Sequence, residues 1–306
     1  MAEVTQIALP AWQFTALLLS PLAVLAGAGA GLRRLVRRRT LPDQDRDWSV
    51  PPLADAAGET LFHRWDIRCK LTALILYSFL VASLERLPPA LAAVGISALA
   101  LVLARSSLAR ALMRLLAITG FLAMFLVAMP LSAPAHPGDT LLVAEGADWL
   151  AFNLRGLHKA LAITAKAAAI ALLMEPLLTT APLPVTLHGL TKLGVPDMAG
   201  QMILLSHRYL HVFRHEAERM AAGMRVRGFR KRTDLETLRA VANFLGMLFV
   251  RSFERTERVF DAMRARGYRG RFPAPAELRM RPADLFLALA WLAAGAALVG
   301  YDRFIG

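Results

Sequence analysis

Apolar residues along this chain occur in blocks that are long enough to cross a membrane. A hydrocarbon core of roughly 30 Å requires about 20 mostly apolar residues in a helix, and fewer where basic side chains at its ends reach the interface. Six blocks meet this requirement, at residues 9–32, 67–84, 88–104, 115–133, 157–178 and 285–301. The pattern therefore predicts an all-α integral membrane protein.

The distribution of basic residues predicts how these spans are oriented. Five arginines between positions 33 and 39 follow the first block directly, while the residues before it include Glu3 and no base. Because basic loops stay in the cytoplasm, the first span is expected to have its N-terminus outside. A cleaved signal peptide would carry its charge before the apolar block, so this span is expected to be retained. Alternation then places the acidic loop around Asp139 outside and residues 175–282 in the cytoplasm.

The amino-acid composition shows that the chain carries a large positive net charge. The chain of 306 residues is 56% hydrophobic with a formal charge of +13, and residues 175–282 contain 19 Lys and Arg against 10 Asp and Glu. Only five of the basic residues are lysines, and arginine is preferred for forked contacts with carboxylates or backbone. Anionic lipid or nucleic acid would suit the same charge. The single cysteine, Cys69, excludes an internal disulfide and a cysteine-based metal cage.

An internal repeat lies within the basic segment. Residues 218–232 (ERMAAGMRVRGFRKR) and 257–271 (ERVFDAMRARGYRGR) align without a gap at a constant offset of 39, and eight of the fifteen positions are identical. Both copies contain the pattern Met-Arg-x-Arg-Gly-aromatic-Arg-x-Arg. Each copy ends a helical pattern that is almost free of Gly and Pro, so Gly228 and Gly267 are predicted to end two helices.

Two explanations account for the arginines at these ends. An arginine in the last turn of a helix interacts favourably with the helix dipole, by up to about 1 kcal/mol, and this alone would explain one copy. Dipole interaction tolerates a base at several nearby positions, whereas the two copies share one spacing. We therefore expect a repeated surface for a repeated partner. Its candidate residues are Arg225, Arg227, Gly228, Arg264, Arg266 and Gly267.

The two helices that lead to these ends are predicted to be amphipathic rather than membrane-spanning. Residues 198–224 place apolar side chains at helical spacing with Arg208, Arg214 and Glu216 between them, and residues 234–263 repeat this arrangement. Such helices lie along the membrane face or pack across each other.

With these features together, the sequence resembles the T component of energy-coupling factor transporters, and within that family the CbiQ type that serves cobalt or nickel uptake. The likeness covers roughly residues 60–300. Residues 177–229 carry its most specific motifs, namely a Thr-Thr pair after a span, then Leu-Gly-Val-Pro and an Arg-Tyr pair. The run FHRWDIRCKL from Phe62 is similar to the start of the family's first core span, with Ile67 where the family commonly has proline.

The repeat falls where the family has paired Ala-Arg-Gly motifs at the ends of its coupling helices. The second copy, at 265–267, matches this motif, and the first has Val226 in place of alanine. The resemblance implies that Arg227 and Arg266 enter grooves on two ATP-binding cassette ATPase subunits. It also implies that they transmit ATP-driven closure to a separate substrate-binding membrane subunit, and that the core has five spans, to which the first span is an addition.

The resemblance and the span count together predict five regions. They are an extra N-terminal transmembrane helix with its basic flank (1–40), a Pro-rich, acidic cytoplasmic linker (41–60), transmembrane spans (61–178), cytoplasmic coupling helices (179–282) and a C-terminal transmembrane helix (283–306). The N-terminal region has no counterpart in the family core. It either anchors the chain or, through its Gly27-x-x-x-Gly31 spacing, binds a small accessory membrane subunit.

The chain lacks the phosphate-binding motif expected of an ATPase. No stretch fits G-x-x-x-x-G-K-[ST], and neither Lys192 nor Lys231 follows a phosphate-binding loop. We therefore expect a non-catalytic subunit that binds no cofactor itself, with ATP and magnesium on the partner ATPases.

Three histidines recur every four residues in the first amphipathic segment, at His207, His211 and His215. A spacing of i and i+4 can place two imidazoles on one metal ion. The flanking Arg208 and Arg214 oppose cation binding, and the resemblance implies that another subunit captures the metal. A hydrated or partner-facing row is therefore favoured over a transient metal contact, and no metal site is predicted in this chain.

Lys166 lies in the middle of the fifth apolar block, where ionisable residues usually face protein or water. The nearest acidic residue in sequence, Glu175, lies about half a turn around the helix, so the two are not predicted to pair. Lys166 is expected to contact either the substrate-binding subunit or another part of the bundle.

Two other functions are weighed against this interpretation. A membrane-anchored scaffold would hold anionic lipid or nucleic acid on its basic helices, but such contacts tolerate irregular spacing, and ten acidic residues dilute the segment. We therefore expect no nucleic acid partner. T components also serve vitamin uptake, although the runs LHGLTKLGVP and HRYLHVF are more similar to the metal group. Because the resemblance places ion selection on another subunit, cobalt and nickel are both candidate substrates.

Overall fold

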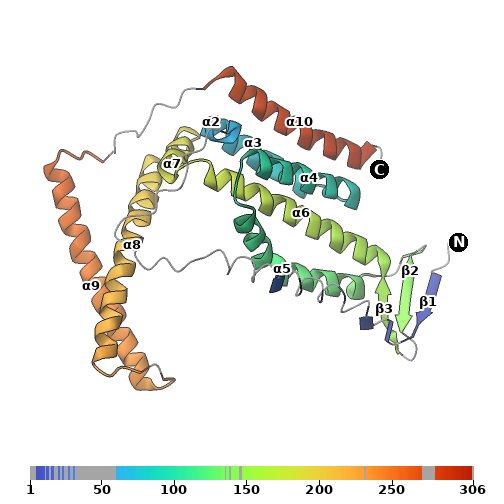
Figure 1. Ribbon diagram of the computed structural model, residues 1–306, viewed down its shortest axis with the longest axis horizontal. Coiled ribbons are helices and arrows are strands. Elements are labelled where there is room, and N and C mark those ends of the chain that lie inside the picture. The colour runs from blue at the N-terminus through green and yellow to red at the C-terminus, as the bar shows by residue number, and fades with distance from the viewer. Residues whose placement is uncertain are drawn as a thin grey trace. The chain divides into compact units, whose positions relative to one another are not determined.

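The computed structural model describes residues 5–10, scattered positions between 12 and 31, and residues 60–304 apart from 135, 138, 145–146, 231 and 271–279. This described part is mainly helical (Figure 1). It divides into two compact units, one formed by Met1–Pro42, Asp55–Ala181 and Arg279–Gly306 and the other by Asp43–Ala54 and Pro182–Leu278. We call them the bundle unit and the amphipathic unit.

The bundle unit contains the apolar helices. Its described helices are α2 (Leu61–Arg64), α3 (Ile67–Ala82), α4 (Leu87–Leu103), α5 (Leu108–Ser132), α6 (Leu154–Thr179) and α10 (Pro282–Phe304). Of these, α5, α6 and α10 are long and apolar enough to cross a membrane, and α4 is apolar but shorter. The predicted all-α membrane fold is confirmed. The predicted first span, 9–32, lies largely outside the described residues.

One helix begins well before its predicted apolar block. The block was placed at 115–133, whereas α5 starts at Leu108 and includes Arg110 and Arg114. Both arginines form ion pairs with the buried Glu175 of α6.

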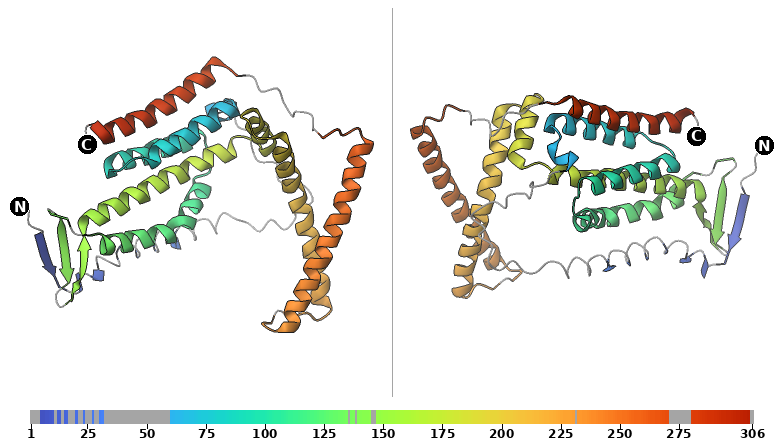
Figure 2. Two further views of the ribbon diagram at one scale, coloured as in Figure 1. Left: turned by 180° about the vertical axis from the view of Figure 1, so that it is seen from behind. Right: turned by 45° about the horizontal axis from the view of Figure 1, so that its top comes forward.

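Small residues set the close packing of the bundle. α6 packs along α4 and α5, while α10 packs along α3 (Figures 1 and 2). At Gly156 of α6, an added Cβ would lie 2.8 Å from the Cα of Pro130 in α5. At Gly295 of α10, it would lie 2.8 Å from a methyl group of Leu80 in α3. Helices approach this closely only where side chains are minimal.

A small sheet, which the sequence pattern did not predict, joins the N-terminal segment to the loop before α6. Its strands are β1 (Thr5–Leu9), β2 (Thr140–Ala144) and β3 (Ala147–Asn153), in the order β1-β2-β3. β1 is parallel to β2, and β2 is antiparallel to β3. The pairing requires both segments on one side of the membrane, which is compatible with the orientation expected from charge.

The amphipathic unit consists of α7 (Leu183–Lys192), α8 (Asp197–Val226) and α9 (Leu235–Ala265). α8 and α9 cross each other (Figure 1) and agree within about two residues with the predicted amphipathic segments. Gly200 is the one buried residue of α8, and α9 has none. The apolar side chains of these helices therefore have little to pack against within the described chain.

Candidate functional site

The first Arg-Gly end closes α8 with a Schellman motif. The helix ends at Val226, and Gly228 follows with a φ of +85°, a left-handed conformation that suits glycine. The backbone N–H of Gly228 donates to the carbonyl of Arg225 at 3.0 Å, and that of Phe229 donates to the carbonyl of Met224 at 3.1 Å. The predicted helix end is observed, and its glycine has a structural role.

The second end closes α9 with the same geometry. The helix ends at Ala265, and Gly267 also has a φ of +85°. Its N–H donates to the carbonyl of Arg264 at 2.9 Å, while the N–H of Tyr268 donates to the carbonyl of Met263 at 3.0 Å. The methionine, glycine and aromatic residue of the repeat are thus parts of one capping motif, of which the sequence analysis identified only the glycine.

The arginine side chains of the repeat are not required by this cap. The motif uses backbone carbonyls, which any residue would supply. All four arginines at the two ends are exposed. Among the described residues, the side chains of Arg225, Arg227 and Arg266 have no hydrogen bond or ion pair, and Arg264 lies over the ring of Phe260 at 5.9 Å. Three guanidinium groups with fixed backbone positions are therefore available to a partner.

Other charged side chains of the amphipathic unit are used within it. Glu216 of α8 accepts hydrogen bonds from Arg251 of α9 and, at 2.7 Å, from Arg219. The bond from Arg251, followed by that from Arg219, holds the pKa of the Glu216 carboxyl below its ordinary value. Arg214 pairs with Glu218 at 3.0 Å. Glu216 thereby ties α8 to α9, while Arg225, Arg227 and Arg266 have no hydrogen bond or ion pair among the described residues.

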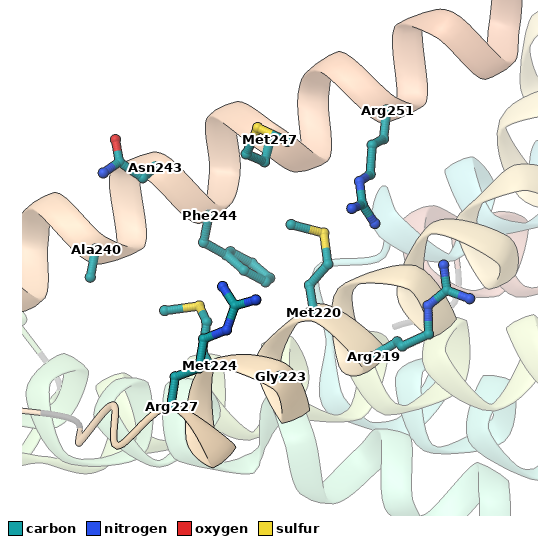
Figure 3. Close-up of a pocket in the computed structure, with 10 residues that line it drawn as sticks. All are labelled: Arg219, Met220, Gly223, Met224, Arg227, Ala240, Asn243, Phe244, Met247 and Arg251. Carbon is teal, nitrogen blue, oxygen red and sulfur yellow. The ribbon is translucent and has the colours of Figure 1, made fainter.

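A groove of about 480 Å³ lies between α8 and α9, beside the first Arg-Gly end (Figure 3). Met220, Met224 and Phe244 supply much of its apolar lining, and Arg227 also lines it. Arg227 thus borders an apolar groove, and its forked donors suit a carboxylate or carbonyl.

The two Arg-Gly ends lie far apart along α9. Arg227 shares the groove with Ala240 near the start of α9, whereas Arg266 caps the far end of this 31-residue helix. At 1.5 Å per residue, roughly 40 Å of helix separates the two positions. Beyond the second end, Tyr268 donates its hydroxyl to Gln201 near the start of α8 at 2.6 Å. The unit thus presents two distant basic ends, a spacing that suits two separate protein chains better than one small ligand.

Lys166 contacts the turn between α3 and α4 within the bundle. Its Nζ donates to the carbonyl of Leu84 at 2.7 Å and to that of Ala82 at 3.2 Å. Of the two contacts considered from the sequence, the intrabundle one is observed. A contact with a substrate-binding subunit stays a prediction for this half-buried side chain.

Glu175 pairs with α5 and not with Lys166, as the helical spacing predicted. Its carboxylate is fully buried, and its oxygens lie 3.0 Å from the guanidinium nitrogens of Arg110 and Arg114. The sequence did not indicate this role for the two arginines, because their partner lies on another helix. Glu175 thus links α5 to α6 through two ion pairs, and removing both arginines would leave a buried carboxylate without a partner.

The histidine row contains one ring contact. The rings of His207 and His211 meet edge to face with centroids 5.5 Å apart, and His215 is exposed. Within the described residues, no three or more His, Cys, Asp or Glu side chains are grouped so that they would hold a metal ion.

Comparison with known proteins decides the family. The sequence model of the family described as "Cobalt transport protein", CbiQ, matches residues 58–275. The chain belongs to the CbiQ family of cobalt transport proteins. It is therefore a T component of the CbiQ type. The match includes both Arg-Gly ends and excludes β1 and α10, which precede and follow it.

Two curated relatives agree with this assignment. The energy-coupling factor transporter transmembrane protein EcfT of Brevibacillus brevis is 28% identical over 225 residues, which are 70% of this chain and 82% of the relative. The cobalt transport protein CbiQ of Rhodobacter capsulatus is 29% identical over 178 residues, which are 56% of this chain and 71% of the relative. Both relatives are transporter components by name.

Proposed function

We propose that this T component is the coupling subunit of an ATP-driven transporter for cobalt or nickel. In this proposal the chain is non-catalytic and binds no cofactor, and ATP and magnesium are held by two partner ATPases. A separate membrane subunit binds the transported ion. The observation that carries the proposal is the pair of identical Schellman-capped helix ends, each with exposed arginines and roughly 40 Å apart.

The geometry supports a mechanical role for these ends. A Schellman cap fixes the backbone of each end, so Arg227 and Arg266 project from rigid helices instead of flexible loops. Each planar guanidinium has five donors that match carboxylates or main-chain carbonyls in an ATPase groove. When the two ATPases close on ATP, each end follows its own subunit, and α8 moves relative to α9. Gly228 and Gly267 serve this function by shaping the ends, while Arg225 and Arg264 extend the basic surface.

The exposed apolar side chains of α8 and α9 are proposed to face the membrane or the substrate-binding subunit. They include Leu238, Leu245 and Phe249 on α9, each more than half exposed. Exposed apolar surface of this extent marks an interaction site. The amphipathic unit then lies at the cytoplasmic face of the inner membrane, between the ATPases and the subunit that they drive.

The proposal of a metal substrate is based on family membership. The matching family and the Rhodobacter capsulatus relative are named for cobalt transport. The Brevibacillus brevis relative has the general name of an energy-coupling factor protein, so a T component for vitamin uptake is the second candidate. The N-terminal region either anchors the chain or binds a small accessory membrane subunit.

Charge reversal at both ends tests the proposal. In cells that express the whole transporter, the double variant Arg227→Glu and Arg266→Glu is expected to insert into the membrane normally, to lose the ATPases on purification and to lose uptake of labelled cobalt or nickel. Arg239→Glu is the matched control, because Arg239 is an exposed arginine of α9 outside the repeat. Normal co-purification and uptake in the double variant would refute the assigned role of these residues.

A further inference from the structure

The helices α7–α9 are joined to the bundle unit at two places in the chain. The first is the end of α6 at Thr179, just before α7, and the second is the start of α10 at Pro282, after α9. These two junctions are the places where the chain passes between α7–α9 and the described helices of the bundle. The contacts at each junction therefore bear on how much of a movement of α8 and α9 is transmitted to the bundle unit.

The first junction is held by a buried lysine. Lys70 of α3 is fully buried, and its Nζ donates to the Thr180 hydroxyl at 2.8 Å and to the carbonyl of Phe62 at 2.7 Å. The Thr180 hydroxyl in turn donates to the carbonyl of Pro176 at 2.6 Å. A buried ammonium group is costly unless its donors are satisfied, so this arrangement resists displacement of Thr180 from Lys70.

The second junction is held by a buried aspartate. Asp284 of α10 accepts the backbone N–H of Arg281 at 2.8 Å through one carboxylate oxygen and that of Asp66 at 3.3 Å through the other. Its own carbonyl accepts from the indole N–H of Trp65 at 3.0 Å. Asp66 in turn caps the start of α3 by accepting from the N–H of Arg68 at 2.9 Å.

Both junctions thus attach to one short stretch, residues 62–70, around the connection of α2 and α3. Phe62 and Lys70 hold the exit before α7, and Trp65 and Asp66 hold the return at α10. Edge-to-face contacts of Phe62 with Trp65 and with Trp291 of α10 pack this stretch from both sides. We call residues 62–70, with Thr180 and Asp284, the junction clamp.

We propose that the junction clamp makes the bundle follow the amphipathic unit, with Lys70, Thr180 and Asp284 as positioning residues. The inference rests on the proposed coupling function. A displacement of α8 and α9 pulls on both junctions, and because both are fixed to one stretch at the start of α3, the bundle moves as a body. Without the clamp, the junctions stretch locally and ATP is hydrolysed without transport.

The proposal is tested by the ratio of ions transported to ATP hydrolysed, measured for the whole transporter in proteoliposomes with labelled cobalt or nickel. Thr180→Val keeps the shape of the side chain but removes the hydroxyl that Lys70 contacts. Its ratio is expected to fall about fivefold or more, with normal ATPase co-purification and hydrolysis. Asp284→Asn is expected to lower the ratio in the same way through the second junction.

Two controls separate the clamp from a general loss of structure. Thr180→Ser restores the hydroxyl and should restore the ratio. Thr186→Val removes a hydroxyl that, like that of Thr180, bonds the carbonyl four residues earlier but belongs to α7 and not to the clamp, so its ratio should be unchanged. An unchanged ratio for both Thr180→Val and Asp284→Asn overturns the inference.

A measurement without partners distinguishes failure of the clamp from failure of the proposed function. In this chain alone, Thr180→Val should accelerate hydrogen exchange not only near Thr180 but also at the Asp66 amide, which Asp284 holds at the other junction. Unchanged hydrogen exchange at the Asp66 amide overturns the clamp, whether or not the ATPases bind. Faster exchange at this amide supports the clamp even if the ATPases fail to bind.

Discussion

The two units of this T component differ in how far their charged residues are buried and paired. In the bundle unit, the buried charges of Lys70, Glu175 and Asp284 each bind groups of the same chain. In the amphipathic unit, α9 has no buried residue, and the side chains of Arg227 and Arg266 are exposed with no ion pair among the described residues. The difference separates polar groups that are satisfied within the chain from the exposed arginines, to which we assign a partner only as a proposal.

The turn between α3 and α4 illustrates the first use. Lys166 of α6 donates to two carbonyls at the end of α3, and Asp302 of α10 accepts the N–H groups of Glu85 at 2.7 Å and Arg86 at 3.1 Å before α4. A cation at a helix C-terminus and an anion at an N-terminus both complement the helix dipoles. The intramembrane lysine that suggested a partner contact thus has a structural task in the described bundle.

The largest expected effect comes from removing a buried charge of the bundle. Glu175→Gln keeps the shape of the side chain but leaves two partly exposed guanidinium groups without their carboxylate, and we expect a loss of about 2–3 kcal/mol of stability. Glu218→Gln in the amphipathic unit breaks the exposed pair with Arg214 and should cost at most about 0.5 kcal/mol. Thermal unfolding of the purified variants in one detergent measures both. Equal losses would contradict the division between the units.

Glycine substitutions should give a smaller effect, with opposite signs in the two units. The Cβ of Gly156→Ala would approach the Pro130 backbone of α5 to 2.8 Å, which should destabilise the bundle by about 1–3 kcal/mol. The Cβ of Gly246→Ala in α9 meets no atom within 4 Å. This substitution should stabilise α9 in the isolated chain by about 0.5–1 kcal/mol and raise its helicity. Thermal unfolding and circular dichroism follow the two changes. A destabilising Gly246→Ala in the isolated chain would show that α9 is packed where the structure leaves it open.

The smallest expected effect is a loosening of the α8–α9 crossing in acid. The pKa of the folded Glu216 carboxyl lies below its ordinary value of 4.5, chiefly because Arg251 bonds it. A depressed folded pKa contributes stability above the ordinary value and loses it as the pH falls through the folded pKa. Spin labels on α8 and α9 should therefore separate below about pH 4.5 in the native chain. In Glu216→Gln the separation should be independent of pH, and a pH-dependent change in that variant would assign it to other groups.

Local patterns in the sequence predicted the helices and their ends. Apolar blocks located the described spans, and the glycine after each Arg pair located the ends of α8 and α9, because a left-handed residue is needed there. The role of the methionine and the aromatic residue in the same caps was within reach of the sequence, since the motif has fixed spacing. The repeat therefore predicts the caps of both helices, which the net charge of the segment does not.

Contacts between distant segments were not predictable in this way. Lys70 and Thr180 are 110 positions apart, and no pattern in the sequence connects them. The parallel pairing of β1 with β2 joins the N-terminal segment to residues near position 140. A strand of five residues is too short for its hydrophobic pattern to predict such a pairing. Such contacts depend on how the helices pack, which hydrophobic periodicity alone does not determine.

Each Arg-Gly end is proposed to bind one ATPase, and the mass of the purified complex shows how many ATPases are bound. Native mass spectrometry should find two ATPase chains on the unmodified T component, one on Arg227→Glu or Arg266→Glu, and none on the double variant. Arg239→Glu should retain two. A double variant that still carries two ATPase chains would contradict the account.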